Sequence, residues 1–413
     1  MNPVSVERPG VVRLSALPPL ALYVHIPWCV RKCPYCDFNS HERAGELPEK
    51  AYVEKLLLDL ESHLPSVWGR RLTSVFIGGG TPSLFSPGSI DALLSGVRAR
   101  LTLEPHAEIT LEANPGTVEA ARFRGFREAG VNRISIGVQS FDDAMLKALG
   151  RIHGASEARR AIDAALAAFD NVNIDLMYGL PGQSEAMARA DITEASRAGV
   201  PHVSAYQLTL EPNTVFWSKP PPLPGHDESA DMQLAVEAIL GDMGFEHYET
   251  SAFAKPGKRC RHNLNYWEFG DYLGIGAGAH GKISFPDRIT RHERAKQPAV
   301  YLQNDLSIEN RIIPPAELPF EFMLNTLRLV EGFPLELFTA RTGLPFTRIQ
   351  NGLDRGEQQG LLQRDLTHVR PTERGQRFLN ELLGLFLSAE TKAPGSGDPG
   401  AVRAIRISSP ASK

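Results

Sequence analysis

Three of the four cysteines fall within eight residues of one another, at Cys29, Cys33 and Cys36. Cysteine thiolates are the usual protein ligands of iron–sulfur clusters, and a four-iron, four-sulfur cubane takes one ligand for each iron. Three cysteines therefore hold three irons and leave the fourth iron free to bind a small molecule. A zinc site is an alternative, in which His25 or His41 would supply a further ligand, and an accidental group of free thiols is another. We interpret the three cysteines as the ligands of a [4Fe–4S] cluster.

Composition excludes several classes of protein. The chain of 413 residues has 44 basic and 48 acidic side chains, a formal net charge of −4, without the basic tract of a nucleic-acid-binding protein. Cys260 lies far from the other cysteines, so a disulfide scaffold is not expected. No apolar run reaches the roughly 18 residues needed to span a bilayer. The apolar segment 11–26 is interrupted by Arg13, Pro18 and Pro19, and we read it as a first strand. We expect a cytoplasmic protein.

Six short β-rich runs, each followed by a helical stretch, must position the cysteines. The runs are 22–26, 72–77, 107–112, 132–138, 172–178 and 202–208. Strands that alternate with helices pair in parallel, and six such units form an open barrel rather than the closed eight-unit form. Helices are expected over 48–63, 157–169 and 227–243. The predicted fold class is α/β, with a segment at 1–20 followed by a partial (β/α)6 barrel at 21–210.

The pattern changes after the sixth predicted strand. A proline-rich stretch at 219–225 opens a connecting region at 211–316, for which we predict a small α+β structure. Consecutive helices and a short hairpin near 361–369 predict a winged-helix-like domain at 317–388. Many winged helices bind DNA, but a basic recognition helix is not evident here, and a fold alone does not establish function. The composition of the tail at 389–413 predicts disorder.

Polar and glycine-rich residues follow the predicted strands. The carboxyl ends of parallel strands meet at one edge, where loops and helix N-termini offer free N–H groups to a ligand. Asn173, Asp175 and Met177 share one face of the fifth strand, which predicts a polar barrel interior. Solvated surface positions or helix caps are the alternative for such residues. The candidates at this edge are Gly79, Gly80, Thr81, Glu112, Gln139 and Asp175.

The spacing Cys-x3-Cys-x2-Cys resembles the cluster loop of the radical S-adenosylmethionine (SAM) enzymes. With Tyr23-Val-His-Ile-Pro-Trp before it and Pro34-Tyr35 inside it, the loop more narrowly resembles the family of oxygen-independent coproporphyrinogen oxidase and its heme-chaperone relative. The resemblance implies that SAM chelates the open iron and that Glu112 binds its ribose hydroxyls. Arg151 could instead form an ordinary surface ion pair. The implied cofactor-contacting residues are Tyr23, Tyr35, Gly79, Gly80, Thr81, Glu112, Gln139, Arg151 and Asp175.

Two departures from the oxidase pattern favour the chaperone branch of this family. The oxidase has a further cysteine where this chain has Phe38, and a longer extension than the 22 residues before Tyr23. The core His262-Asn-x-x-Tyr266-Trp267 resembles the signature of the chaperone. It implies heme binding, with His262 as candidate axial ligand and the two aromatic rings as apolar contacts. A hydrogen-bonded core histidine is the alternative, and His280 is the next candidate ligand.

We therefore predict a protein that carries a [4Fe–4S] cluster and SAM, binds heme and passes it to an acceptor protein. Membrane heme proteins are among the acceptors to consider, and no nucleic acid is expected as a partner. The leading alternative is an enzyme that oxidatively decarboxylates coproporphyrinogen III by means of a SAM-derived radical. A more remote alternative is a winged-helix regulator with an iron–sulfur sensor.

Overall fold

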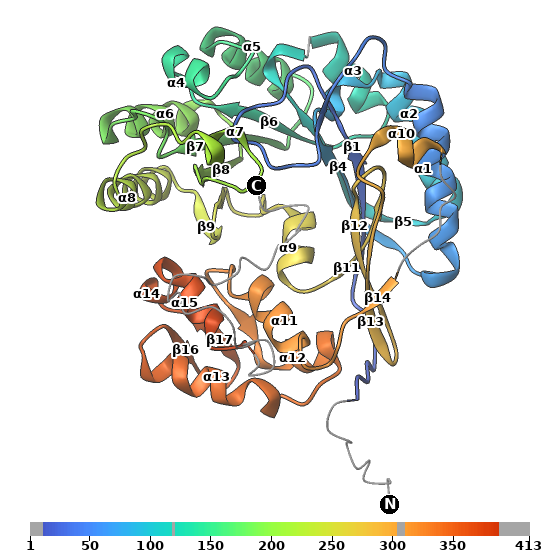
Figure 1. The fold of residues 1–413 in the computed structure, drawn as a ribbon, viewed down its shortest axis with the longest axis vertical. Coiled ribbons are helices and arrows are strands. Elements are labelled where there is room, and N and C mark those ends of the chain that lie inside the picture. Colours follow the sequence, from blue (N-terminus) through green and yellow to red (C-terminus); the bar gives the residue numbers. More distant parts are fainter. Residues whose placement is uncertain (1–10, 118–119, 304–309, 388–413) are drawn as a thin grey trace, which may run out of the picture.

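The structure is a computed structural model that describes residues 11–117, 120–303 and 310–387. Its centre is an open barrel with helices outside it and a smaller C-terminal unit packed below it (Figure 1). The strands of the barrel belong to one sheet of twelve strands, in the order β14-β13-β12-β11-β1-β4-β5-β6-β7-β8-β10-β9. The tail at 389–413, for which disorder was predicted, lies outside the described ranges. The first half of the segment 1–20 lies outside them as well.

The six predicted strands are confirmed and pair in parallel in chain order. They are β1 (Leu20–Ile26), β4 (Leu72–Gly79), β5 (Leu103–Ala113), β6 (Arg133–Gln139), β7 (Val172–Tyr178) and β8 (His202–Gln207). A further parallel strand, β11 (Asp271–Ile275), pairs with the other edge of β1, with Leu20 opposite Asp271 and Tyr23 opposite Gly274. The strand that leads into the cysteine loop is therefore interior to the sheet, because it has a parallel partner on each side.

The connecting region extends the barrel sheet at both edges. Beyond β11 lie the antiparallel strands β12 (His280–Phe285), β13 (Arg288–Glu293) and β14 (Asn310–Ile312). Beyond β8 lie β10 (Ala252–Ala254) and β9 (Glu246–Glu249), also antiparallel. The short strands β2 (Trp28–Cys29) and β3 (His41–Glu42) pair within the cysteine loop. Hence the described strands of the connecting region join the barrel sheet and form no separate sheet of their own, and the boundary at 210 remains a prediction from sequence.

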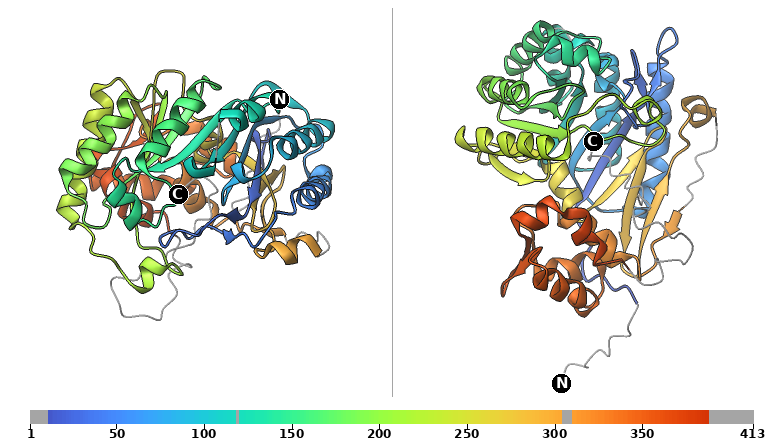
Figure 2. Two further views of the ribbon diagram at one scale, coloured as in Figure 1. Left: turned by 90° about the horizontal axis from the view of Figure 1, so that it is seen from above. Right: turned by 60° about the vertical axis from the view of Figure 1, so that its left-hand side comes forward.

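Helices cover the outer face of the barrel (Figure 2, left). The helices predicted over 48–63, 157–169 and 227–243 correspond to α1 (Glu49–His63), α5 (Ala155–Leu166) and α8 (His226–Asp242). Ser86 caps α2 (Pro87–Arg100) by accepting the Ser89 N–H, and Pro87 occupies its first turn, where no N–H is needed. The other helices before residue 304 are α3 (Ala120–Glu128), α4 (Asp143–Ala148), α6 (Glu185–Arg197), α7 (Val215–Ser218), α10 (Pro298–Gln303) and α9 (Arg261–Trp267), of which α9 lies on the inner side of the sheet, with His262 against Phe76 of β4.

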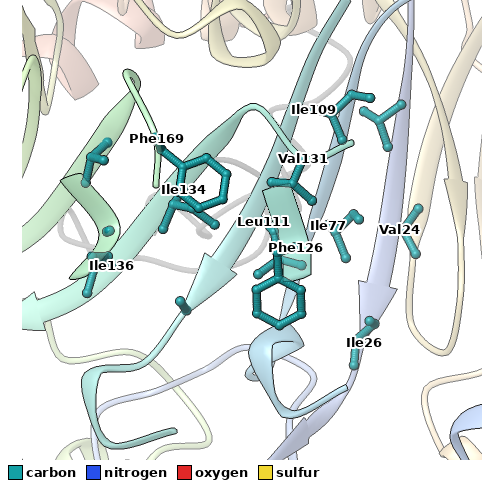
Figure 3. Close-up of a cluster of buried hydrophobic side chains, with 14 of the residues drawn as sticks. Val24, Ile26, Ile77, Ile109, Leu111, Phe126, Val131, Ile134, Ile136 and Phe169 are labelled. Atoms are coloured by element: carbon teal, nitrogen blue, oxygen red, sulfur yellow. The ribbon is translucent and has the colours of Figure 1, made fainter. Parts of the chain in front are cut away.

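The main hydrophobic core lies between the strands and these helices (Figure 3). Alternate residues of the strands, such as Val24, Ile77 and Leu111, point outward and belong to the same buried cluster as Phe126 of α3. Each fully buried side chain of this size stabilises the fold by roughly 1.5–3 kcal/mol relative to its exposed state. Because successive residues of a strand point to opposite faces, the residues between these apolar ones face the barrel interior.

The C-terminal unit has helices and a three-stranded sheet in the order β15-β17-β16, which fits the predicted winged-helix-like shape. Phe322 lies at its centre, with its ring 5.0 Å from that of Phe333 and 5.2 Å from that of Phe338. Within the described ranges, no helix has both the length and the apolar character needed to cross a membrane. The elements are α11 (Leu318–Thr326), β15 (Phe333–Pro334), α12 (Leu335–Thr342), α13 (Thr347–Gln358), β16 (Leu362–Arg364), β17 (His368–Pro371), α14 (Glu373–Arg377) and α15 (Leu379–Gly384).

Candidate cofactor site at the barrel rim

A cavity of about 600 Å³ lies at the carboxyl ends of the parallel strands and extends into the barrel. Its far wall includes Gln376 and Arg377 of the C-terminal unit. All but one of the cofactor and cluster residues predicted from the sequence line this cavity, and Tyr23 is the exception. The lining residues from that prediction are Cys29, Cys33, Cys36, Tyr35, Gly79, Gly80, Thr81, Glu112, Gln139, Arg151, Asp175 and His262.

The cysteine loop leaves the end of β1 and is tied to the protein on its far side. Asn39 donates from its side chain to the Ala277 carbonyl at 2.9 Å, and its own carbonyl lies 2.9 Å from His25 Nε2. Each of the three loop sulfurs has a polar partner, and each is half-buried. The partners are Thr81 Oγ1 at 3.6 Å from Cys29, Arg151 at 3.6 Å from Cys33 and Ser40 Oγ at 3.8 Å from Cys36. Burial raises the pKa of the Cys36 thiol to about 11.

The glycines at the end of β4 allow the cysteine loop, as well as a ligand, to come close to the backbone. Gly79 has a φ of +118°, and a Cβ on it would lie 2.6 Å from the ring of His25. A Cβ on Gly80 would lie 2.6 Å from the Trp28 carbonyl oxygen. The same stretch holds the loop through backbone hydrogen bonds, from Gly80 N–H to the Ile26 carbonyl and from Thr81 N–H to the Trp28 carbonyl, both 2.8 Å long. The glycines therefore let β4 and the loop form one wall of the cavity.

Two carboxyl groups face the cavity, from β5 and from β7, the next strand but one in the sheet. Glu112 Oε2 accepts the Gly79 N–H at 3.0 Å, and Asp175 accepts hydrogen bonds from Ser135 at 3.0 Å and Asn173 at 2.8 Å. Burial raises the pKa of Glu112 to about 8, and the charge of Asp175 adds to this effect. Burial also raises the pKa of Asp175, against the hydrogen bonds from Asn173 and Ser135. A ligand with hydroxyl or cationic groups could donate hydrogen bonds to these oxygens.

Gln139 and Arg151 close the side of the cavity near the loop. Gln139 has a φ of +72°, which is uncommon for a residue with a side chain and is typical of functional sites. Arg151 donates to the Gly137 carbonyl at 2.7 Å as well as to the Cys33 sulfur. The alternative of a surface ion pair is not what the structure shows, because no carboxylate within the described ranges is an ion-pair partner of Arg151 and its Nε is buried without a hydrogen bond.

Tyr23 lies behind the cavity wall. Its hydroxyl is 2.6 Å from His25 Nδ1, and its ring stacks on Phe76 at 5.5 Å. The structure thus gives Tyr23 a supporting position, in which it orients the histidine that holds the cysteine loop. Tyr35 does line the cavity, and its ring lies 6.3 Å from that of Phe216.

Several inward-facing polar residues in and below the cavity were missed in the sequence, although the alternation of the strands could have identified them. Glu108, Thr110 and Glu112 occupy every second position of β5, and Arg133 and Ser135 do so in β6. Arg133 is 2 % exposed and its Nε is 4.0 Å from Glu108 Oε2, so a buried ion pair lies at the base of the cavity. Polar residues at the inward-facing positions of adjacent strands are the sequence signal that identifies them.

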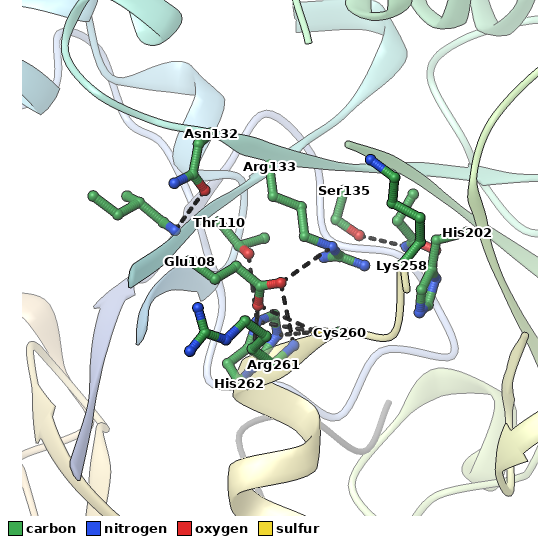
Figure 4. A network of polar contacts seen from close by, with 12 residues as sticks. Glu108, Thr110, Asn132, Arg133, Ser135, His202, Lys258, Cys260, Arg261 and His262 are labelled. Carbon is green, nitrogen blue, oxygen red and sulfur yellow. Dashed lines mark hydrogen bonds and ion pairs between the residues drawn. The ribbon is translucent and has the colours of Figure 1, made fainter. Parts of the chain in front are cut away.

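His262 belongs to a polar network around Glu108 (Figure 4). Its Nδ1 is 2.9 Å from Glu108 Oε1, and its ring stacks on Phe76 at 4.3 Å with an interplanar angle of 9°. Burial lowers the pKa of His262, and Glu108 opposes this effect. Burial alone would raise the pKa of Glu108, but the hydrogen bond from His262 and the charge of Arg133 lower it overall. The network is therefore an ionised carboxylate with a neutral imidazole.

The aromatic residues of the same motif point elsewhere. Tyr266 and Trp267 are 3 % and 1 % exposed and pack with Ala21, Tyr272 and Leu329 in a cluster of their own. Neither residue lines the cavity. The expectation that these two rings contact a macrocycle in this cavity is therefore wrong for this structure. Tyr266 lies one turn after His262 on the same side of α9, but its ring packs against that of Tyr272 at 4.8 Å in the core, where Trp267 is also buried.

Comparison with known proteins identifies the family. The chain is 52% identical over 374 residues to the heme chaperone HemW of Escherichia coli, a match that spans 90% of this chain and 99% of that protein. It is 49% identical over 383 residues to HemW of Haemophilus influenzae, spanning 91% and 100% of the two chains. The chain belongs to the HemW family. The radical SAM superfamily profile matches residues 23–195, and that of the HemN C-terminal domain matches 313–378.

The fold of this chain is similar to that of a solved protein structure. Coproporphyrinogen III oxidase (HemN) from Escherichia coli superposes with a TM-score of 0.74 at 21% identity, covering 90% of each chain. This likeness confirms the α/β radical SAM fold. Radical SAM membership implies a [4Fe–4S] cluster and SAM, and the residues present fit both. Three thiols face one cavity, each with a polar partner, and the Arg151 cation beside them can balance thiolate charge.

Proposed function

We propose that this chain binds heme and passes it to an acceptor protein, with a [4Fe–4S] cluster and SAM at the rim of its barrel. The observation that carries the proposal is the 52% identity to a protein named as a heme chaperone, across 99% of that protein's length. The cavity supports it, since about 600 Å³ of space adjoins the three thiols and the imidazole of His262. A reducing compartment such as the cytoplasm suits the site, because open thiols and a cluster both require one.

The cluster ligands in this proposal are Cys29, Cys33 and Cys36. Gly79, Gly80 and Thr81 lie in the cavity wall beside the cysteine loop and hold the methionine part of SAM. Glu112 accepts hydrogen bonds from the ribose hydroxyls of SAM. Gln139, Arg151 and Asp175 line the same pocket, with Tyr35 beside the loop and Tyr23 supporting it through His25. When bound, the cluster and SAM supply radical chemistry. The binding roles proposed for these side chains do not depend on whether this chain uses that chemistry.

His262 is the proposed axial ligand of heme. Its Nδ1 is engaged by Glu108, and Nε2 lies 3.4 Å from the Cys260 sulfur, a weak partner that an iron can displace. A carboxylate at the other nitrogen strengthens an imidazole ligand. The flat ring of Phe76 lies against the imidazole and fixes its plane. Transfer requires release, and a single protein ligand at the wall of a large cavity suits a carrier.

Heme titration of the anaerobically reconstituted protein tests the proposal. His262→Ala should weaken heme binding or shift the Soret band, with iron and sulfide content unchanged. His280→Ala is the matched control, because this histidine lies near Glu293 and does not line the cavity. An unchanged Soret band and affinity in His262→Ala would refute its role, and failure of the loaded protein to pass heme to any apo-protein would refute the carrier function.

SAM binding is tested separately. Glu112→Ala should weaken SAM binding by roughly 5-fold to 150-fold, the effect of leaving a buried hydrogen-bond partner unpaired at about 1–3 kcal/mol, without loss of iron. Equilibrium dialysis with reconstituted protein measures both quantities. Unchanged SAM affinity would remove Glu112 from the site.

The second candidate function is oxidation of coproporphyrinogen III, which the fold similarity to HemN favours. We expect no such activity, because Phe38 stands where the oxidase has a further cysteine. Purified protein with SAM and a reductant should therefore leave coproporphyrinogen III unconverted. Sustained formation of protoporphyrinogen IX would overturn the chaperone function in favour of the enzyme.

A further inference from the structure

Three potential metal ligands converge at the base of the cavity, away from the cysteine loop. They are Glu108 of β5 and two residues at the start of α9, Cys260 and His262. One ligand atom from each lies within 4.8 Å of the other two, and all three residues are buried. The distances are 3.1 Å from Cys260 Sγ to His262 Nδ1, 2.9 Å from His262 Nδ1 to Glu108 Oε1, and 3.6 Å from Cys260 Sγ to Glu108 Oε1.

These distances match the edges of a tetrahedral zinc site. Zinc binds sulfur at about 2.3 Å, and nitrogen and oxygen at about 2.0–2.2 Å, so its ligand atoms lie about 3.3–3.6 Å apart in a tetrahedron. The three observed separations come within about 0.5 Å of these values. Small rotations of the side chains would bring all three atoms to bonding distance around one ion. Sulfur, nitrogen and oxygen together form a donor set that zinc accepts and that magnesium and calcium do not prefer.

The surroundings of the three residues prepare Glu108 to bind with one oxygen. Oε1 is the oxygen near Cys260 and His262, whereas Oε2 accepts the Arg261 N–H at 3.1 Å and lies 4.0 Å from the Arg133 guanidinium. The second oxygen thus stays fixed, while the first keeps the hydrogen bond from the His262 backbone N–H, 3.1 Å away, and would exchange its contact with the imidazole N–H for an ion. Cys260, His262 and Asn263 also line the cavity, so a water or small ligand can reach a fourth position.

We propose that Glu108, Cys260 and His262 bind a zinc ion, with its fourth coordination position open to the cavity. Binding replaces the Cys260 thiol proton, which leaves with the solvent, and moves the imidazole proton from Nδ1 to Nε2. The ion carries two positive charges and the ligands two negative charges, so the site becomes neutral beside Arg133.

This inference goes beyond heme binding and shares one residue with it. A proton on Nε2 blocks that nitrogen from binding iron, so zinc and heme exclude each other at His262. Cys260 contacts His262 but is not a ligand of the proposed heme, and serine at this position would keep a polar side chain beside the imidazole. A Cys260 variant therefore separates the two proposals.

The test is zinc binding to the full-length, cluster-reconstituted protein, followed by competition with a chromophoric chelator and by X-ray absorption at the zinc edge. One zinc per chain should bind, with one sulfur at about 2.3 Å and the remaining ligands nitrogen or oxygen at about 2.0–2.2 Å. Cys260→Ser and Glu108→Gln should each lower zinc affinity by roughly 100-fold or more, because each removes one of three ligands. Heme affinity of Cys260→Ser should be unchanged.

His153→Gln is the matched control, since this histidine is also buried, at 3 % exposed, and hydrogen bonds to Asn114 and the Val138 carbonyl. It should bind zinc as the unmodified protein does. The proposal is overturned if the unmodified protein binds no zinc, if the absorption data show three sulfurs as at the cysteine loop, or if Cys260→Ser retains full affinity. Should Cys260→Ser fail to fold, the sulfur count in the unmodified protein decides.

Discussion

Replacing Glu112 by glutamine should change how the stability of the protein depends on pH. The substitution keeps the size of the side chain and a carbonyl oxygen to accept the Gly79 N–H, but it removes the ionisable group. Burial beside Asp175 raises the pKa of Glu112 from 4.5 to about 8. In the folded protein the carboxyl group therefore keeps its proton over a range of pH in which the unfolded chain has lost it.

The size of the effect follows from this difference. Glu112 stabilises the fold fully below pH 4.5, and its contribution decreases as the pH rises to about 8, because folding must then either bind a proton or bury a charge. Between pH 6 and pH 9 the unmodified protein should lose about 3 kcal/mol more than Glu112→Gln, at 1.36 kcal/mol for each pKa unit. Water in the cavity screens the charge, so this figure is an upper value.

Urea unfolding of both proteins, reconstituted, anaerobic and without SAM, measures the difference at each pH. Groups other than Glu112 titrate in both proteins and cancel. Asp191→Asn is the matched control: burial raises the pKa of Asp191 only to about 6, so its variant should run nearly parallel to the unmodified protein between pH 6 and pH 9. Parallel curves for Glu112→Gln as well would refute the raised pKa.

Three further substitutions test the supports of the site. Lys282→Met removes a buried cation 2.9 Å from Asp271 and should destabilise the protein by about 3 kcal/mol in thermal unfolding; an unchanged midpoint would contradict this. Ser86→Ala removes the cap of α2 and should cost about 1 kcal/mol in urea unfolding, whereas no loss would show that the cap is dispensable. Gly79→Ala should lower the iron bound per chain, because its Cβ would meet the ring behind the loop, while Gly88→Ala, with open space around it, should retain iron; equal iron in both would refute this.

The six parallel strands and the rim residues were predictable because each depends on local pattern. Alternation of strand and helix fixes parallel pairing, and parallel pairing brings Glu112, Gln139 and Asp175 to one edge. By contrast, β11 was not predicted, since its five residues have no following helix and its partner β1 is remote in the chain. Pairing between remote strands leaves no local signal.

The motif around His262 shows the limit of reading spacing without structure. A histidine and two aromatic residues close together in sequence were expected to face one ligand. Tyr266 does lie on the same side of α9 as His262, one turn further on, but its ring packs against Tyr272 in the core. Trp267 is buried in the same cluster. His262 lines the cavity, whereas Tyr266 and Trp267 fill the core. Glu108 was missed for the complementary reason, because its partners come from a distant part of the chain.

The interior position of β1 has a consequence for how the protein is made. Leu20 pairs with Asp271, so β1 has an unpaired edge until the ribosome has synthesised most of the chain. An unpaired interior strand exposes backbone N–H and C=O groups and can pair with other chains. Contacts between residues so distant in sequence also form slowly during folding. A fragment limited to residues 23–195 would keep this edge open permanently, and we expect it to aggregate. The pairing of β1, the strand that leads into the cysteine loop, is thus completed late in biosynthesis.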